Sequence, residues 1–248
     1  MRPRVVEPEM MDQPDLDVRL HVHALDALGR ANAISRTAAC LWPAIRAASQ
    51  NGLPRPLRVL DVACGGGHVL VSLARRACRE GLEIDWLGWD LSPVAVDYAR
   101  TLAARAGVKG VRFELADALR TPAPAGADVV LCTLFLHHLS DEDAARLLQG
   151  MRDGARRMVV VSDLRRTRLG AAFAWVGCRM LSRSEVFRVD GMRSVAAAFT
   201  IDEARTLAER AGLSGARITR VWPQRWLLTW GQVSNTTSSP KPPLRGWV

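Results

Sequence analysis

Three glycines close the segment from Leu60 to Gly67, which reads LDVACGGG. Glycine lets the backbone turn sharply and approach a ligand closely, and a helix that begins there offers free N–H groups. No lysine followed by serine or threonine comes after the glycines, so the segment is not a phosphate-binding P-loop. Leu70 stands where a dinucleotide-binding loop needs its last small residue, which disfavours NAD. The segment predicts a ligand-binding loop of another kind.

Two aspartates further along could contact the same ligand. Asp90 ends the next apolar run, and an acid about 20 residues past such glycines is the usual acceptor for ribose hydroxyls. A helix cap is the alternative role for Asp90, but Ser92 already fills it. Asp117, followed by Ala118, ends a third run and could read an adenine edge or simply face water.

These residues need elements to position them, and the chain alternates short apolar runs with helical patterns of 10–15 residues. Such alternation predicts βαβ units and a parallel sheet, with ligands bound beyond the carboxyl ends of the strands. We expect strands at 57–62, 84–89, 111–115, 128–133 and 158–162, and helices at 69–79, 93–106 and 141–151. Ser92, Pro93 and Gly107 mark the ends of one helix, and Ser140 caps another.

The flanks of this alternation differ from it. Residues 1–17 are rich in Pro, Asp and Glu and predict a flexible lead-in, and residues 18–56 predict a helical cap divided or kinked at Pro43. Residues 164–199 hold seven arginines and two acids around an apolar stretch, which predicts a helical insertion. A helix at 201–211 and strands at 216–222 and 226–230 would complete a domain spanning 57–230, and residues 231–248 predict a disordered tail.

Composition limits the class of protein. The chain has 248 residues, of which 48% are hydrophobic and 24% charged, which suits a globular domain with a real core. Charges interrupt every apolar run before the ~18 residues that suggest a membrane helix, and no secretory signal is expected. Five cysteines without a C-x-x-C pair predict reduced thiols in a cytoplasmic protein. The net charge of +9 fits nucleic acid, anionic lipid, an anionic substrate or an arginine-rich genome equally well.

With these segments in register, residues 57–163 resemble a class I S-adenosylmethionine-dependent methyltransferase. The match lies in DVACGGG at 61–67, WDLS at 89–92, ADA at 116–118 and LCTLFLHHL at 131–139. The last segment is similar to the ubiquinone and menaquinone biosynthesis (UbiE-like) branch, and the flanks look like bacterial secondary-metabolite methyltransferases. The resemblance implies an α/β, Rossmann-like doubly wound sheet of seven strands whose last strand is antiparallel. His68 departs from the acidic residue often seen just past this loop.

The family's cofactor, S-adenosyl-L-methionine, would then occupy the strand ends. The resemblance implies that the loop at Gly65 to Gly67 meets its amino-acid part, Asp90 its ribose, and Asp117 with Ala118 its adenine. Further cofactor contacts are expected around the same strand ends, at Asp61, Ala63, Leu91 and Thr133. We expect no metal.

A methyl acceptor that attacks through oxygen or carbon must lose a proton. His137 and His138 lie where the family places the acceptor, and histidine is the side chain best suited to proton transfer near neutral pH. Asp163, at the end of the fifth strand, could orient a histidine or act as the base itself. The alternative is that the histidines only bond the loop and that Asp163 is an ordinary strand-end acid.

Three functions remain open at this point. The first is methyl transfer to oxygen, or carbon, of a small phenolic, quinol or polyketide-like acceptor, with the helical cap and the insertion closing as a lid. The second is methylation of RNA or another nucleic acid, which the net charge suggests but no recognition module or Pro-Pro-Tyr motif supports. The third is a non-catalytic cofactor-binding protein. We expect the first, without a membrane span.

Overall fold

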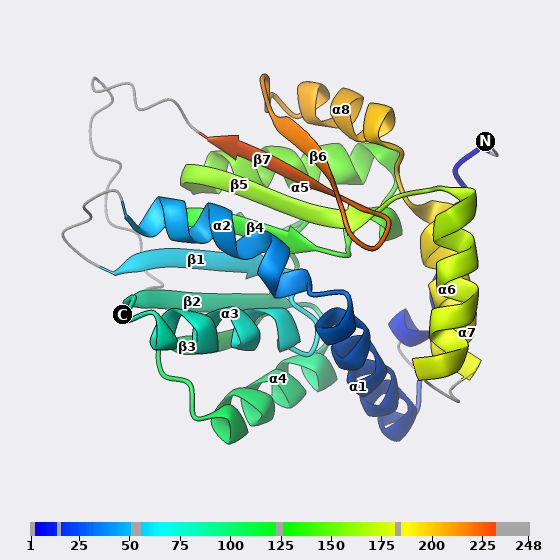
Figure 1. The fold of residues 1–248 in the computed structure, drawn as a ribbon, viewed down its shortest axis with the longest axis horizontal. Helices are drawn as coiled ribbons and strands as arrows, with labels where there is room; N and C mark the ends of the chain where they lie inside the picture. The colour runs from blue at the N-terminus through cyan, green and yellow to red at the C-terminus, as the bar shows by residue number, and fades with distance from the viewer. Residues whose placement is uncertain (1–2, 14–15, 51–55, 123–125, 182–184, 232–248) are drawn as a thin grey trace.

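The computed structural model describes residues 3–13, 16–50, 56–122, 126–181 and 185–231 (Figure 1). The strands are β1 Leu57–Val62, β2 Ile84–Asp90, β3 Val111–Leu115, β4 Ala127–Thr133, β5 Ala155–Leu164, β6 Arg217–Val221 and β7 Arg225–Gly231. The helices are α1 Val18–Ile34, α2 Thr37–Ser49, α3 His68–Arg79, α4 Pro93–Ala106, α5 Asp141–Gly154, α6 Arg168–Leu181, α7 Glu185–Ala197 and α8 Ile201–Arg210. Two short 3-10 helices are η1 Met10–Asp12 and η2 Leu136–His138.

The strands form one seven-stranded sheet in the order β3-β2-β1-β4-β5-β7-β6. Neighbours from β3 to β5 are parallel, whereas β7 runs antiparallel to both β5 and β6. The predicted α/β sheet with an antiparallel last strand is therefore confirmed. The strand order reverses between β1 and β4, and a ligand crevice is expected outside the carboxyl ends at such a point.

Helices cover both faces of the sheet, which explains why its central strand β4 is buried along its whole length. All seven residues of β4 are buried. One core lies between the sheet and α5 with α8, and the other between the sheet and α2, α3 and α4. Parallel strands buried on both faces lose the alternation of polar and apolar residues, and this is the pattern that β4 has.

The expected helix ends are found where the capping residues stand. The Ser92 hydroxyl accepts from Ala95 N at 3.2 Å before α4, and Gly107 closes α4 with φ +63°. The predicted division at Pro43 was wrong, because Pro43 lies inside α2. The break between α1 and α2 falls instead at Ser35 and Arg36, where Arg36 adopts φ +52°.

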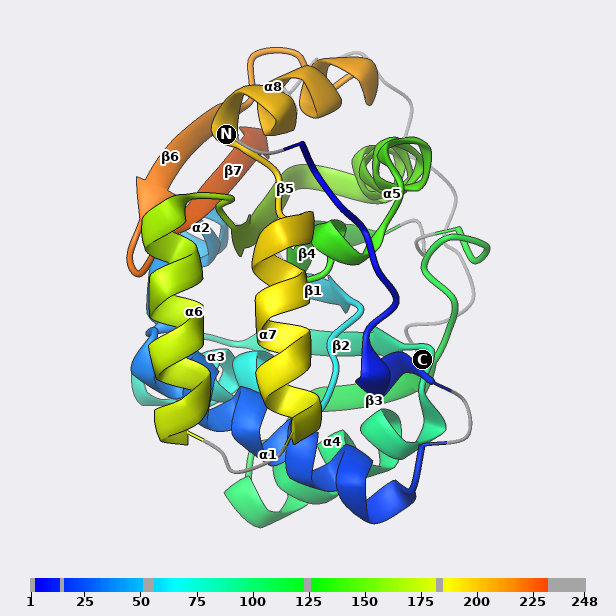
Figure 2. The ribbon, with the colours of Figure 1, turned by 90° about the vertical axis from the view of Figure 1, so that its right-hand side faces the viewer.

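The carboxyl edge of the sheet is covered by α1, α6, α7 and the N-terminal segment 3–13 (Figure 2). The insertion predicted at 164–199 forms the two helices α6 and α7, which pack on each other. Segment 3–13 lies along α7, whereas we expected a flexible lead-in; its contacts are described with the site. The predicted tail lies outside the described residues from position 232 onward. Among the described helices, none is long and apolar enough to cross a membrane.

Candidate functional site

The carboxyl ends of β1, β2 and β3 are fixed side by side by backbone hydrogen bonds. Cys64 N donates to Trp89 O at 2.8 Å, and Ala116 N donates to Asp90 O at 2.9 Å. These two bonds place the residues that follow three strands along one rim. The predicted ligand contacts in the glycine loop, at Asp90 and at Asp117 are therefore neighbours in space.

The loop after β1 has a backbone that suits a closely approaching ligand. Gly65 has φ +54°, and a Cβ built on it would meet no atom within 4 Å. Gly67 has φ +72°, and there a Cβ would collide with the Phe113 ring at 2.7 Å. Gly65 thus leaves open space beside the loop, whereas Gly67 allows α3 to pack closely on the sheet. Ala63 also adopts a positive φ of 54°, an uncommon conformation for a residue with a side chain.

Asp90 links the glycine loop to the start of α4. Its carboxylate accepts from Gly65 N at 2.7 Å and from Ser92 N at 2.9 Å. Each carboxylate oxygen has a further lone pair, so ribose hydroxyls could still donate to it. Leu91, next along the chain, is 67% exposed, so an apolar side chain is accessible beside Asp90.

Asp61 is the most unusual group at the cofactor end. Its side chain is fully buried at the end of β1, and neither carboxylate oxygen has a hydrogen-bond partner among the described residues. Burial, with a smaller contribution from the charge of Asp90, raises the pKa of Asp61 to about 8. A buried carboxylate without a donor calls for a ligand that supplies one. An ammonium group such as that of a bound amino acid fits this requirement, so the residues present fit S-adenosylmethionine.

The remaining predicted cofactor residues lie around the same rim. The Asp117 carboxylate accepts from Leu119 N at 2.9 Å and lies 3.4 Å from the Arg120 guanidinium, so it shapes the loop after β3. Ala118 packs against the core, and Thr133 ends β4 beside Ser162. His68 contacts Tyr98, with its Nε2 at 3.2 Å from the hydroxyl oxygen, and Tyr98 in turn bonds Asp26 of α1. His68 therefore ties the loop to the helical cap, and does not replace the acidic residue it departs from.

On the other side of the switch point, His137 and Asp163 form a buried pair. His137 Nδ1 lies 2.6 Å from Asp163 Oδ1, and His137 N donates to the other carboxylate oxygen at 3.0 Å. Leu164 N also donates to Asp163, at 2.6 Å. The two residues come from η2 after β4 and from the end of β5, which are adjacent parallel strands. The structure thus brings together two of the three predicted catalytic residues.

The charge of Asp163 fixes the proton on the His137 ring. Burial alone would raise the pKa of Asp163, but the neighbouring charge of His137 and the hydrogen bonds from His137 and Leu164 together lower it. An ionised carboxylate can only accept hydrogen bonds, so Nδ1 of His137 carries the shared proton. When the His137 ring is neutral, its other nitrogen, Nε2, carries the lone pair that a general base requires.

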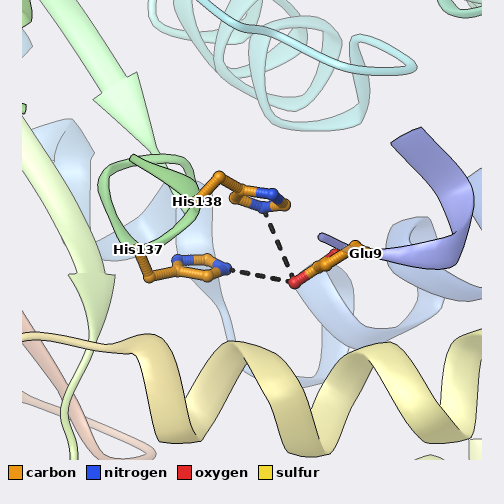
Figure 3. Close-up of side chains that lie close together, drawn as sticks. All are labelled: Glu9, His137 and His138. Atoms are coloured by element: carbon orange, nitrogen blue, oxygen red, sulfur yellow. Dashed lines mark ion pairs between the residues drawn. The ribbon is translucent and has the colours of Figure 1, made fainter. Parts of the chain in front are cut away.

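Glu9 faces this free nitrogen (Figure 3). Its Oε1 atom lies 3.8 Å from Nε2 of His137 and 3.8 Å from Nε2 of His138, too far for hydrogen bonds. The rings of His137 and His138 lie 4.4 Å apart, and His138 also stacks on Phe135. Burial raises the pKa of Glu9, against the opposing effects of His138 and His137. The ligand atoms of Glu9, His137 and His138 lie within 4.8 Å of one another, so the cluster has the geometry to hold a divalent cation, where the sequence predicted no metal site.

Glu9 reaches the site because segment 3–13 is fixed along α7. Arg4 donates to Ala197 O at 2.6 Å and to Leu139 O at 2.5 Å, and its guanidinium lies over the Phe199 ring. At the other end, Met10 N and Met11 N donate to the Asp190 carboxylate at 2.8 and 3.0 Å. Glu9 itself accepts a hydrogen bond from the Ser194 hydroxyl. Nothing in the composition of this acidic stretch singled out Glu9, because its partners lie more than 120 residues away along the chain.

Several arginines of the insertion have structural partners. Arg166 donates to Ala198 O at 2.5 Å and to Glu203 at 2.6 Å, and Arg193 donates to Glu7 at 3.1 Å. Arg165 donates to the Gln224 side chain at 2.6 Å. These three side chains hold the insertion to its neighbours.

Comparison with known proteins gives this arrangement a context. Residues 59–157 match the family model described as a methyltransferase domain. A demethylmenaquinone methyltransferase from Deinococcus radiodurans is 35% identical over 121 residues, which are 46% of this chain and 47% of the relative. A ubiquinone biosynthesis O-methyltransferase from Xanthomonas euvesicatoria is 33% identical over 132 residues, or 51% of each chain. The chain thus spans about half the length of the curated relatives it matches.

Solved structures show a similar fold at low sequence identity. An O-methyltransferase family 2 protein from Planctomyces limnophilus, in complex with apigenin, covers 90% of this chain with a TM-score of 0.63 and 19% identity. The match spans 63% of that protein's chain. The magnesium protoporphyrin IX methyltransferase from Synechocystis, with bound S-adenosylhomocysteine, covers 83% of this chain and 84% of its own, with a TM-score of 0.56 and 19% identity.

Proposed function

The chain belongs to the class I S-adenosylmethionine-dependent methyltransferases, and on this premise we propose that it methylates an oxygen of a small phenolic or quinol acceptor. The match of residues 59–157 to a methyltransferase domain and the order of the seven-stranded sheet support this family. One similar relative is named a demethylmenaquinone methyltransferase and another a ubiquinone biosynthesis O-methyltransferase, which supports an acceptor of this class. Carbon methylation of the same kind of acceptor is the alternative.

The observation that carries the proposal is the buried His137–Asp163 pair beside the cofactor rim. A phenol has a pKa near 10, like the tyrosine side chain, so at neutral pH it keeps its proton. A free imidazole nitrogen at the acceptor position supplies the base that such a hydroxyl needs. Methyl transfer to a nucleophile that carries no proton would not require this pair.

The cofactor residues would divide the work along the rim. Asp61 would accept from the cofactor's ammonium group, Asp90 from its ribose hydroxyls, and the open side of Gly65 would lie against its amino-acid part. Asp117 and Ala118 would meet the adenine, and Leu91 and Thr133 would line the site. S-adenosylmethionine supplies, when bound, a methyl group on a positively charged sulfur that leaves as a neutral thioether.

The chain's own residues would align the acceptor and remove the proton of its hydroxyl group. The walls of the site would hold the acceptor oxygen in line with the methyl group, and such alignment can lower a barrier by roughly 7–11 kcal/mol at best. His137 Nε2 would take the hydroxyl proton as the oxygen gains its methyl group. The resulting imidazolium would lie between the carboxylates of Asp163 and Glu9, which stabilise its charge. His138 would pack beside the acceptor.

The parts of the chain around this edge would exclude water from the reaction. Residues 3–13, α1, α6 and α7 surround the carboxyl ends of the strands (Figure 2). A covered site strengthens the electrostatic interactions inside it, and opening is then required for acceptor entry and product release. We propose that residues 164–199 form this lid, with segment 3–13 as its second part.

The test is an assay of the full chain with methyl-labelled S-adenosylmethionine and a panel of phenols and quinols. We expect label on an acceptor oxygen, and none on matched acceptors whose hydroxyls are already methylated. A melting assay should show stabilisation by S-adenosylmethionine and S-adenosylhomocysteine but not by NAD; ligand at 100 times its Kd adds about 2.7 kcal/mol. Stabilisation by NAD alone, or label found on RNA and not on any phenol, would overturn the proposal.

A further inference from the structure

The helix α6 exposes an apolar stripe to solvent. Its members recur at spacings of four, three and four residues, which places them on one face of a helix with 3.6 residues per turn. They are Leu169, Phe173, Val176 and Met180, all exposed, and Met180 is 81% exposed. Large side chains scattered singly over a surface need no explanation, but four in one line form a patch that does.

The opposite face of α6 is already occupied. Gly170 and Cys178 are buried, and Cys178 packs so closely on α7 that a Cβ at Gly191 would meet its sulfur at 2.4 Å. The helix therefore has an inner face that holds it to the protein and an outer face that no described part of the chain covers. Figures 1 and 2 show α6 at the outside of the molecule, beside α7.

A row of cationic and aromatic side chains runs beside the apolar stripe. Arg168, Trp175 and Arg179 are separated by seven and four residues, so they share a second, adjacent line, and all three are exposed. The Arg179 guanidinium lies 4.2 Å from the centroid of the Trp175 ring. In the part of the chain that the structure describes, no carboxylate pairs with Arg168 or Arg179. The sequence between Asp163 and Glu185 contains five arginines and no acid.

We infer that this outer face of α6 docks on the surface of a lipid bilayer that contains anionic lipids. Helices that lie in the plane of a membrane surface combine an apolar stripe with arginines and tryptophan in this way. The apolar side chains enter the boundary of the acyl chains, while the guanidinium groups meet lipid phosphates. Tryptophan favours the same boundary because its ring is apolar and its N–H is polar.

Charge argues against a second copy of the chain as the occupant. A symmetric pair of α6 faces would bring Arg168 and Arg179 of one copy against the same residues of the other. Like charges in contact oppose such a pairing, whereas an anionic surface satisfies every arginine of the row at once. The net charge of +9 would add a longer-range attraction to the same surface.

The position of α6 indicates a function for the bilayer contact. Asp163 stands near the end of β5, and only residues 165–167 separate that strand from α6. A bilayer contact at α6 would therefore bring the covered edge of the sheet close to lipid, from which a lipophilic acceptor could be drawn. This consequence rests on the proposed function, whereas the bilayer contact itself does not.

The test measures co-sedimentation of the full chain with vesicles, without any turnover. Vesicles of phosphatidylcholine with phosphatidylglycerol should bind the chain at least ~10-fold more tightly than phosphatidylcholine alone, and added salt should weaken the binding. The triple variant Phe173→Ser, Val176→Ser, Met180→Ser should lose at least ~10-fold in affinity. Its matched control, Phe173→Leu, Val176→Leu, Met180→Leu, keeps the stripe apolar and should bind like the parent.

Arginine variants separate the charge from the apolar stripe. Arg168→Gln with Arg179→Gln should weaken binding to anionic vesicles by about fivefold per arginine. The matched control is Arg146→Gln with Arg205→Gln, exposed arginines on α5 and α8, and it should change binding far less. Equal vesicle binding by the parent and the serine variant would overturn the inference. So would a parent that is dimeric in light scattering and binds no vesicles, together with a monomeric serine variant, because the stripe would then be a dimer interface. Because no methyl transfer is measured, failure here leaves the proposed function untouched.

Discussion

Two buried aspartates at the carboxyl ends of neighbouring regions of the sheet have opposite chemistry. Asp61, after β1, has no hydrogen-bond partner among the described residues, and burial raises its pKa to about 8. Asp163, at the end of β5, accepts three hydrogen bonds from His137 and Leu164, which lower its pKa against the effect of burial. Both side chains are almost completely shielded from solvent, so burial alone does not explain the difference.

The difference teaches that the two halves of the site are completed in different ways. The acceptor half supplies its own donors, so the His137–Asp163 pair is already oriented before any ligand binds. The proposed cofactor half leaves the Asp61 carboxylate without a donor, so a ligand with an ammonium group would complete it. A preorganised pair favours catalysis, because no reorganisation is then required during the reaction. A buried carboxylate without a donor favours ligand binding, because a donor on the ligand removes the free-energy cost of the unpaired group in the free protein.

The largest expected effect is on turnover, at the preorganised half. His137→Ala should lower the rate of methyl transfer by at least ~10²-fold, because a positioned general base contributes about 10²–10⁴-fold. The affinity for S-adenosylhomocysteine, measured by calorimetry, should stay unchanged, because His137 lies on the acceptor side.

Companion variants and a chelator sharpen this result. Asp163→Asn and His138→Ala should lower the rate by smaller factors, and Glu9→Gln should slow it without changing the shape of the cluster. A chelator should leave the parent's rate unchanged. A rate that a chelator abolishes and a divalent metal restores would show instead that Glu9, His137 and His138 act as metal ligands. Near-normal rates in all four variants would mean that positioning alone suffices.

The next effect is on cofactor affinity, at the incomplete half. Asp90→Ala removes a charged acceptor from the ribose hydroxyls, and such hydrogen bonds contribute ~1.5–3 kcal/mol each, so we expect a Kd for S-adenosylhomocysteine weaker by about 10–100-fold. Asp90→Asn retains an oxygen for Gly65 N and Ser92 N, and should lose less. An unchanged Kd in the alanine variant would remove Asp90 from the ribose site.

The two halves also differ in how far the sequence predicts them. The glycine loop and Asp117 follow strands β1 and β3, and Asp90 is the last residue of β2. Parallel strands bring their ends to one edge, so local patterns were enough to predict that these residues lie together. The pairing of His137 with Asp163 follows from the same rule, because β4 and β5 are neighbours. The break in the helical cap lies at Arg36 and not at Pro43. The sequence could not predict this position, because no residue type marks the positive φ that Arg36 adopts.

Glu9 could not be predicted from the sequence, for a different reason. It depends on contacts between segment 3–13 and α7 whose partners lie 180 to 186 residues apart along the chain. An acidic, proline-containing stretch predicts disorder when its partners are unknown. The half-buried Arg4, which donates to Ala197 O and Leu139 O, shows that one long side chain can fix such a segment.

The smallest expected effect is on stability, and it has opposite signs at the two aspartates. The pKa of Asp61 is raised in the folded state, so its contribution to stability is complete below its ordinary pKa near 4 and is lost as the pH rises through about 8. Asp61→Asn should therefore raise the melting temperature of the ligand-free protein at pH 9, where a gain of ~1 kcal/mol corresponds to about 2–4 °C. The pKa of Asp163 is lowered, so its contribution is present above its ordinary pKa, and Asp163→Asn should lower the melting temperature at the same pH. Saturating S-adenosylhomocysteine should reverse the first result, because an ammonium beside Asp61 favours the charged carboxylate that the asparagine lacks. Equal shifts in the two variants at pH 9 would mean that Asp61 has a donor in solution, and the contrast between the two halves of the site would then fail.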